Sequence, residues 1–562
     1  MKIEIGLVLV ASFCSMVSGK AVGTVKSAAK ASSLFAMSVA EPTHSSSIGT
    51  NYYQDLIQLS LARKITTGRS NVNVGVIDTG IDITNPFLLD LVNTSLSVDN
   101  SFNNDINSPF IEYNQGIPFG HWHGTCVSGI ISSSLNQGNY VMGINSNVKL
   151  ASLRSDGLTS ADFTETYKTV TDSITYANNN SIDIVNYSGG FEANSYNEGY
   201  FQNGGGSASS LQSEINSYSG LIVVAAGNSG MNLDSYNVWP ATFSNDNILV
   251  VGNSTSSDNK NSSSNYSSTH VDIFAPGTDI WTTYFGNEYA QVSGTSFSAP
   301  MVTGVAAMMK SVNPNLTASQ IKSLIMNNVD QVSALSDKCV SGGRLNAFKA
   351  VRAAIPLFAT FNTAVPIVQQ LSPGQTQWYK LSLQANKSYT IKTTGSLTTK
   401  GYLYRYIENN PNVTATPGGY GTNFLMSNIS YSTDRIMYLC IENVGPTTGT
   451  PSLQIDIHTH SYTYQYLDLT NTYHRAMCVC GAGKNELHAY AAGGTTCLKC
   501  GHVGSGGFIK GNESPIYFGN SNSSYIIPDQ GIYIATDDIN DYHNGNLIIP
   551  DYECDDCECE YC

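Results

Sequence analysis

Apolar residues follow two different patterns along the chain, and the change comes near Pro356. Between Asn71 and Ala354, short continuous apolar runs alternate with stretches of helical periodicity. The runs predict buried strands at 72–78, 148–154, 182–187, 221–226 and 248–252. Helices are expected after His123, over 161–178 and 209–217, and from Ser296 and Thr317, where Gln320 completes a capping box. This alternation predicts an α/β fold with a doubly wound, mostly parallel sheet and helices on both faces.

After Pro356, polar residues alternate with β-branched and aromatic ones. The alternation predicts strands at 376–383, 388–394, 401–406, 435–442 and 452–458. We therefore expect an antiparallel β-sandwich domain over residues 356–459. Residues 460–510 form a Cys/His-rich module, and residues 511–562 form an acidic tail that ends in closely spaced cysteines.

The first residues have the pattern of an export signal. An apolar stretch from Ile5 to Val17 follows Lys2, is too short to span a bilayer, and ends in small residues. We expect a signal peptide at 1–19, and a secreted or extracellular protein, with the cell surface or a lysosome-like compartment as further destinations. No other apolar run is long enough to cross a membrane, so no transmembrane anchor is expected.

Composition agrees with an extracellular destination. The 562 residues include 27 basic and 42 acidic side chains, a net charge of -15, which argues against nucleic acid as a partner. Asn-x-Ser/Thr sequons predict a glycoprotein if the chain passes through a eukaryotic secretory route. They include those at Asn93, Asn253, Asn261, Asn265, Asn315, Asn386, Asn412, Asn428, Asn512 and Asn522.

Three short motifs supply an aspartate, a histidine and a serine, each where one element passes into the next. They are VGVIDTG at 74–80, HGTCVSG at 123–129 and GTSFSAP at 294–300. The candidate residues are Asp78, His123 and Ser296, which are the three side chains of a nucleophilic triad. Taken singly, each has a structural explanation, as a turn former, a core histidine or a helix N-cap. Their joint occurrence in this order favours catalysis.

Further segments extend the pattern. They are IDIVNYSGG at 182–190, AAGNSG at 225–230, WPA at 239–241 and GGRLNA at 342–347. With these anchors, residues 56–354 resemble the subtilisin-like (subtilase) serine endopeptidases. The resemblance implies a peptidase domain over 46–355, protein and peptide substrates, and a catalytic step that requires no cofactor. It gives no indication of oligomeric state.

The resemblance also implies roles for residues outside the triad. Asn228 would donate its side-chain amide to the oxyanion, and Ser188, Gly189 and Gly190 would pair with an extended substrate. Gly189 stands where the family often has a larger apolar residue. Its presence either widens the adjoining subsite or loosens the strand.

The segment before the expected domain is short. Subtilases usually carry an inhibitory propeptide of several tens of residues, whereas only residues 20–45 separate the expected signal from the domain. These residues are expected to be a short pro-segment or linker. Either they shield the active site, or the domain folds without such help.

The cysteines allow more than one interpretation. Removal of Cys14 with the signal leaves an odd number, and Cys126, close to His123, is the best candidate for a buried, inert thiol. Two pairs, each followed by glycine, either bind structural Zn²⁺ or form two disulfides; they are Cys478, Cys480, Cys497 and Cys500. Calcium often stabilises the resembled family, but the sequence singles out no ligand set for it.

These observations predict a secreted serine endopeptidase that works through an acyl-enzyme. The alternative is a catalytically silent surface adhesion or binding protein that uses its β-rich C-terminal half. The presence of all three triad residues and of Asn228 favours the enzyme. A lipase-type hydrolase is disfavoured because Ser296 lies in no Gly-x-Ser-x-Gly motif.

Overall fold

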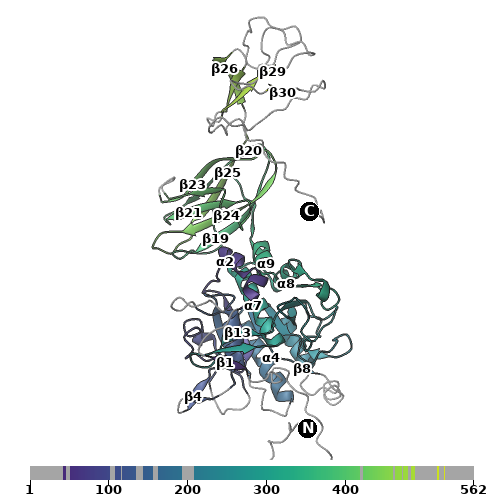
Figure 1. Ribbon diagram of the computed structural model, residues 1–562. Coiled ribbons are helices and arrows are strands. Elements are labelled where there is room, and N and C mark those ends of the chain that lie inside the picture. The colour runs from purple at the N-terminus through teal and green to yellow at the C-terminus, as the bar shows by residue number, and fades with distance from the viewer. Residues whose placement is uncertain are drawn as a thin grey trace, which may run out of the picture. The chain divides into compact units, whose positions relative to one another are not determined.

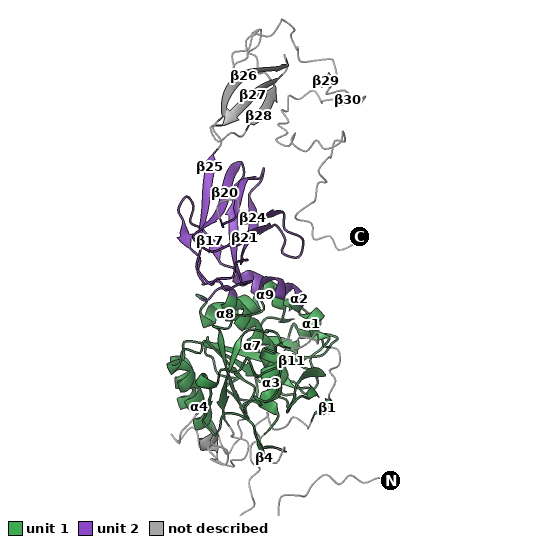
Figure 2. Ribbon diagram, turned by 90° about the vertical axis from the view of Figure 1, so that its left-hand side faces the viewer, with its two compact units in different colours: residues 1–59, 67–311, 315–350 green, residues 60–66, 312–314, 351–562 purple. Residues whose placement is uncertain are grey.

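The structure is a computed structural model. It describes residues 42–45, 51–101, 108–114, 117–119, 121–134, 143–155, 163–192, 208–417 and 422–459, and further strands at 462–470, 473–478, 483–487, 516–517 and 524–525. The chain divides into two compact units (Figure 2). Unit 1 comprises 1–59, 67–311 and 315–350, and unit 2 comprises 60–66, 312–314 and 351–562.

Figure 1 shows the fold as a ribbon. Unit 1 is built on a nine-stranded sheet. Its strands, in spatial order, are β15 (Asp330–Gln331), β16 (Gly343–Arg344), β12 (Ile273–Pro276), β11 (Ile248–Ser254), β9 (Leu221–Ala225), β7 (Ile184–Tyr187), β2 (Asn73–Asp78), β6 (Lys149–Arg154) and β3 (Val98–Asp99). All neighbouring pairs are parallel except β15 with β16. The strands are apolar on both faces, as in β9, where every residue is buried, because helices cover both faces. The expected fold class is confirmed.

The helices of this fold occupy the intervals between the strands. They are α1 (Tyr53–Leu56), α2 (Leu59–Ile65), α3 (His123–Ile131), α4 (Phe163–Asn179), α6 (Ala208–Ser217), α7 (Thr295–Val312), α8 (Ala318–Met326) and α9 (Ala347–Ala354), of which α2 lies mostly in unit 2. The expected capping box is present, because Thr317 and Gln320 exchange hydrogen bonds at the start of α8. Short 3-10 turns lie at Thr94–Leu96 and Ser333–Leu335.

The chain order changes direction in the sheet at β2. From β2 the chain passes to β6 on one side, and then returns to place β7, β9 and β11 on the other. In open α/β sheets, ligands bind beyond the carboxyl ends of the strands at such a switch point. Asp78 ends β2, and Ser188 directly follows β7 at the neighbouring carboxyl end.

Smaller sheets complete the unit. One is antiparallel and contains β1 (Thr43–Ser45), β14 (Tyr289–Val292) and β13 (Ile280–Thr283). Two-stranded pairs join β8 (Phe191–Glu192) to β10 (Val238–Trp239), and β4 (Glu112–Asn114) to β5 (Ile117–Phe119). The last residues of the expected pro-segment therefore form a strand of unit 1.

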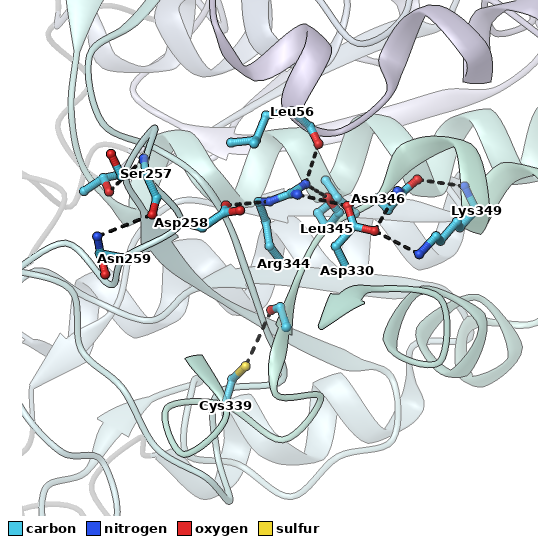
Figure 3. A network of polar contacts seen from close by, with 12 residues as sticks. Leu56, Ser257, Asp258, Asn259, Asp330, Cys339, Arg344, Leu345, Asn346 and Lys349 are labelled. Atoms are coloured by element: carbon cyan, nitrogen blue, oxygen red, sulfur yellow. Dashed lines mark hydrogen bonds and ion pairs between the residues drawn. The ribbon is translucent and has the colours of Figure 1, made fainter. Parts of the chain in front are cut away.

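A buried arginine connects several segments of unit 1 (Figure 3). Arg344 lies 2.7 Å from Asp258 and 2.9 Å from Asp330, and also donates to the backbone oxygens of Leu56 and Leu345. Its planar guanidinium can satisfy these separate acceptors at once, which a lysine could not do.

The network continues on the far side of Asp330. Asn346 donates to the carboxylate of Asp330 at 3.0 Å and to the side chain of Gln58. Nζ of Lys349 lies 2.9 Å from the same carboxylate. The end of the GGRLNA segment is thus tied to the start of the unit.

Unit 2 contains a β-sandwich, as expected. One sheet has the order β17 (Leu357–Phe358), β19 (Thr376–Leu383), β24 (Arg435–Asn443), β21 (Thr399–Tyr404) and β22 (Val413–Ala415). The other has the order β18 (Val365–Pro366), β25 (Ser452–Thr459), β20 (Lys387–Thr394) and β23 (Leu425–Ser430). A single core joins both sheets, with Leu381 and Leu439 from the first packed with Ile391 and Ile455 from the second. Among the described strands of the sandwich, only β17 and β19 pair in parallel.

Beyond residue 460, an antiparallel sheet is formed by β26 (Tyr462–Thr470), β27 (Tyr473–Cys478) and β28 (Gly483–Leu487), followed by the pair β29 (Ile516–Tyr517) and β30 (Ser524–Tyr525). Cys478 is the last residue of β27. Cys480, Cys497 and Cys500 lie outside the described residues, as do the expected signal peptide at 1–19 and most of the acidic tail.

Candidate active site

Asp78 and His123 form a buried pair. Nδ1 of His123 lies 2.9 Å from Oδ1 and 3.0 Å from Oδ2 of Asp78. Only 8% of Asp78 and 1% of His123 is exposed. The backbone N–H of Thr79 donates to the carboxylate at 2.8 Å, which fixes its orientation. The carboxylate therefore determines which imidazole nitrogen carries the proton.

The HGT motif explains how the histidine reaches this strand end. A Cβ atom at Gly124 would lie 2.3 Å from the backbone oxygen of Gly80, so the first turn of α3 approaches β2 too closely for any side chain. The Gly124 N–H donates to the hydroxyl of Thr79 at 3.0 Å, and that hydroxyl donates to the His121 carbonyl. Thr79 thus connects the two motifs.

Ser296 lies in the first turn of α7 and is fully buried. Its hydroxyl donates to the Ser188 carbonyl at 3.2 Å, and the Ser188 hydroxyl donates to the Ser296 carbonyl at 2.7 Å. Asn186 donates to the Ser188 hydroxyl and accepts from Thr303 on α7, each at 2.9 Å. These contacts attach the end of β7 to α7.

Aromatic rings connect the histidine to the serine segment. The rings of His123 and Phe297, the residue after Ser296, have centroids 5.4 Å apart, and Trp122 stacks on Phe297 at 6.5 Å. In the described part of the chain, Nε2 of His123 is buried and has no hydrogen-bond partner. The second imidazole nitrogen is therefore available.

Asn228 presents a second buried group without a partner. Its Oδ1 accepts from the backbone N–H of Thr295 at 2.9 Å and from the Thr295 hydroxyl at 3.0 Å. Both donors of Thr295 need an acceptor, so the amide oxygen of Asn228 faces Thr295. Nδ2, on the other side of the planar amide group, therefore points away from Thr295. Nδ2 has no partner among the described residues. Gly294, with φ of 149°, brings the backbone past this amide: a Cβ atom there would lie 3.4 Å from Nδ2.

Unpartnered buried polar groups are rare in folded proteins, since each costs about 1–3 kcal/mol. Here an acceptor nitrogen on His123 and a donor nitrogen on Asn228 occur close to the segment that carries Ser296. Such groups are explained if a substrate supplies their partners.

Ser188, Gly189 and Gly190 follow β7, and all are buried. The space that a side chain at Gly189 would fill is taken by the ring of Tyr187, whose Cε2 would lie 2.9 Å from the added Cβ atom. A side chain at position 189 would therefore have to displace this ring.

Other polar residues near the motifs have structural contacts. Asp82 accepts hydrogen bonds from the Thr84 backbone at 2.8 Å, from Tyr113 at 2.6 Å and from the Gly286 backbone at 2.6 Å. These bonds occupy its carboxylate within the fold.

Cys126 is fully buried on α3, which confirms the expected burial, and it forms no disulfide with another described cysteine. Cys339 and Cys440 are also buried thiols, and burial raises the pKa of both. Within the described ranges, no three His, Cys, Asp or Glu side chains are grouped so as to hold a metal ion. The proposed zinc ligands cannot be compared with this finding, because most lie outside those ranges.

Several residues of the site were not identified from the sequence. Thr79 and Thr295 hold the histidine and asparagine segments, and Tyr187 fills the space beside Gly189. The threonines occur inside the motifs, directly next to Asp78 and Ser296, so their position in the sequence was an available signal. The contact of Tyr187 with Gly189 had a weaker signal, a spacing of two that places both on one face.

Comparison with known proteins agrees with this geometry. The model of the subtilase family (Peptidase_S8) matches residues 69–347. The chain is 31% identical over 256 residues to subtilisin DY of Bacillus licheniformis, covering 45% of this chain and 81% of that protein. It is 30% identical over 305 residues to thermitase of Thermoactinomyces vulgaris, covering 54% of this chain and 95% of that protein.

A third relative, the thermophilic serine proteinase of Bacillus sp. (strain AK1), is 30% identical over 292 residues, which cover 51% of this chain and 63% of that protein. The matched region contains Asp78, His123, Asn228 and Ser296. The chain belongs to the subtilase family of serine peptidases.

Proposed function

We propose that this chain hydrolyses peptide bonds of proteins through an acyl-enzyme formed on Ser296. The observation that carries the proposal is the buried contact of His123 with Asp78: the His123 ring lies beside Phe297, which follows Ser296, and its Nε2 has no hydrogen-bond partner among the described residues. Asn228 supplies an oriented amide donor in the same neighbourhood.

In the first step His123 acts as the general base. The Ser296 hydroxyl leaves the Ser188 carbonyl by rotation about its Cα–Cβ bond and gives its proton to Nε2 as Oγ attacks the substrate carbonyl carbon. Asp78 stabilises the imidazolium that results. Burial of the pair strengthens this interaction, because little water screens it.

The tetrahedral intermediate carries its negative charge on the former carbonyl oxygen. Nδ2 of Asn228 and the backbone N–H of Ser296, at the start of α7, are the proposed donors to it. His123 then returns its proton to the leaving amine, and the C–N bond breaks. In the second half, His123 takes a proton from a water molecule that attacks the acyl carbon. The bond from this carbon to Oγ of Ser296 then breaks, Oγ receives the proton from His123, and the acid is released.

Substrates bind as an extended strand beside residues 188–190. Backbone pairing of this kind is insensitive to substrate sequence, so side-chain contacts decide preference. Val238, which is buried and paired with β8, is a further candidate for shaping the primary subsite. Val238 and residues 188–190 are uncharged, which favours apolar substrate side chains.

We also propose that the protein is secreted. The apolar segment at 5–17 supports this, although it lies outside the described residues. The described residues include no helix that is both long and apolar enough to cross a membrane. Of the sequons, Asn428 is exposed, whereas Asn253 and Asn265 are fully buried and inaccessible to glycosylation in the folded protein.

The proposal is tested with two serine variants two positions apart. Ser296→Ala removes the nucleophile, and Ser298→Ala, in the same turn of α7, is the matched control. Casein digestion should be lost in the first and retained in the second. If Ser296→Ala folds and still digests casein at the wild-type rate, the proposed mechanism is wrong.

A further inference from the structure

The aromatic ring of Tyr187 fills the space beside Gly189, which has no side chain. A Cβ atom added to Gly189 would lie 2.9 Å from Cε2 of Tyr187, and 3.0 Å from its Cζ and Oη. Carbon atoms in favourable contact are about 3.5–4.0 Å apart. The Tyr187 ring therefore already occupies the volume that a residue 189 side chain would enter.

Glycine is required at 189 by this ring and not by backbone conformation. The φ angle of Gly189 lies outside the left-handed region that favours glycine. Tyr187 is the last residue of β7, and side chains two positions apart extend on the same face of an extended segment. The two residues thus present one surface.

Two further aromatic rings, those of Phe191 and Tyr167, support the ring of Tyr187. Tyr187 contacts Phe191 at 6.5 Å between centroids, and Phe191 stacks on Tyr167 of α4 at 4.1 Å. The pairing of β8 with β10 fixes Phe191 in turn. Burial raises the pKa of the Tyr187 phenol, and the negative charge of Asp78 adds to the effect, so the group is neutral.

We propose that Tyr187 is a specificity-determining residue. Its ring occupies the place of the side chain that position 189 lacks, and there it contacts the substrate side chain that lies opposite Gly189. The inference rests on the proposed function, in which substrate lies as a strand beside 188–190. Directly opposite residues in paired strands place their side chains on one face, with Cβ atoms about 4.5–5.5 Å apart. The subsite has an aromatic wall that favours apolar side chains and limits their size.

The main test is a peptide-library digest with four proteins: wild type, Tyr187→Ala, Tyr187→Ala with Gly189→Leu, and Tyr218→Ala. Tyr218 is a buried tyrosine of unit 1, bonded to the Ile182 carbonyl, and serves as the control for lost stability. Relative cleavage rates within one library are independent of the folded fraction.

Tyr187→Ala should shift preference toward bulky side chains at one substrate position, by about tenfold or more in relative kcat/KM. The double variant should move back toward wild type, and Tyr218→Ala should keep the wild-type profile. An active Tyr187→Ala with the wild-type profile at every position overturns the inference. A wild-type protein that cleaves no peptide instead overturns the proposed function.

A second measurement needs no activity. Gly189→Leu should lower the melting temperature when Tyr187 is present, and should cause a smaller loss or a gain in the Tyr187→Ala background. Side chains that share one volume give such non-additive effects. Equal losses in both backgrounds would show that the ring does not fill the space, and would overturn the inference independently of catalysis.

Discussion

The side-chain oxygen of Asn228 accepts hydrogen bonds from both the backbone nitrogen and the hydroxyl of Thr295, at 2.9 and 3.0 Å. Thr295 directly precedes Ser296. The same contact that attaches Asn228 to the serine segment therefore also leaves its amide nitrogen available, and this nitrogen has no partner among the described residues.

Two substitutions at Asn228 separate these roles. Asn228→Asp keeps an oxygen for Thr295 but replaces the donor by a second oxygen, whereas Asn228→Ala removes both. We expect kcat to fall about 10²- to 10³-fold in each with little change in KM, because the donor acts on the transition state. Steady-state kinetics on a peptide substrate measures this. Activity of Asn228→Asp within about tenfold of wild type would exclude Asn228 as the donor.

Asp78→Asn should lower kcat about 10⁴-fold without unfolding the protein, because an amide can favour the wrong tautomer of His123. Asp82→Asn provides a control at a buried carboxylate on the same segment, which contacts Thr84 and Tyr113. It should affect stability more than kcat. Similar losses of kcat in both variants would argue that the effect of Asp78 is structural.

Gly129 allows α3 to approach β13. A Cβ atom there would lie 2.1 Å from the hydroxyl of Thr283 and 2.8 Å from that of Thr282. These hydroxyls donate to carbonyls of the helix that begins at His123. Gly129→Ala should therefore destabilise the protein by about 1–3 kcal/mol in urea unfolding, as overpacked sites do.

Gly449→Ala is the matched control for this variant, because its Cβ atom would meet nothing closer than 3.4 Å. It should change the free energy of unfolding by less than about 0.5 kcal/mol. If both substitutions cost the same, close approach of α3 to β13 is not what requires glycine.

The lowered pKa of Asp330 predicts that the folded protein loses stability in acid. Burial alone would raise its pKa, but hydrogen bonds from Lys349 and Asn346 and the charge of Arg344 outweigh burial and hold the pKa below its usual value. The ionised carboxylate thus stabilises the fold above the unfolded-state pKa of about 3.9. That contribution is lost as the pH falls through the lower pKa of the folded state.

Urea unfolding of wild type and Asp330→Asn at several pH values tests this prediction. Wild type should be more stable at neutral pH, and its advantage should shrink as the pH falls toward about 3. An advantage that stays constant or grows in acid would show that the charge of Asp330 does not contribute.

Much of unit 1 was predictable because its central strands are continuous apolar runs. The run at 221–226 is β9, shorter by one residue, and that at 182–187 is β7, which begins two residues later. The strands β13 and β14 were missed, since they are short and mix polar with apolar residues. In unit 2, β22 and β23 were missed for the same reason.

The site shows a similar division. Motifs pointed to Asp78, His123, Asn228 and Ser296 as candidates, because each lies within two positions of a glycine in a short motif. Contacts between distant segments could not be derived: the bond of Ser296 to Ser188 joins residues 108 positions apart. The ring of Tyr187 over Gly189 was also missed, because a lone tyrosine after an apolar run is typical of a core residue.

Covalent labelling with a serine-directed organophosphonate tests the central claim most directly. Peptide mapping by mass spectrometry should find the label on Ser296 alone, with unchanged labelling in Ser298→Ala and none in Ser296→Ala. Labelling should also be slow in Asp78→Asn, because His123 then fails to activate the hydroxyl. A folded wild-type protein that takes up no label at Ser296, or is labelled equally at Ser298, would contradict the proposed mechanism.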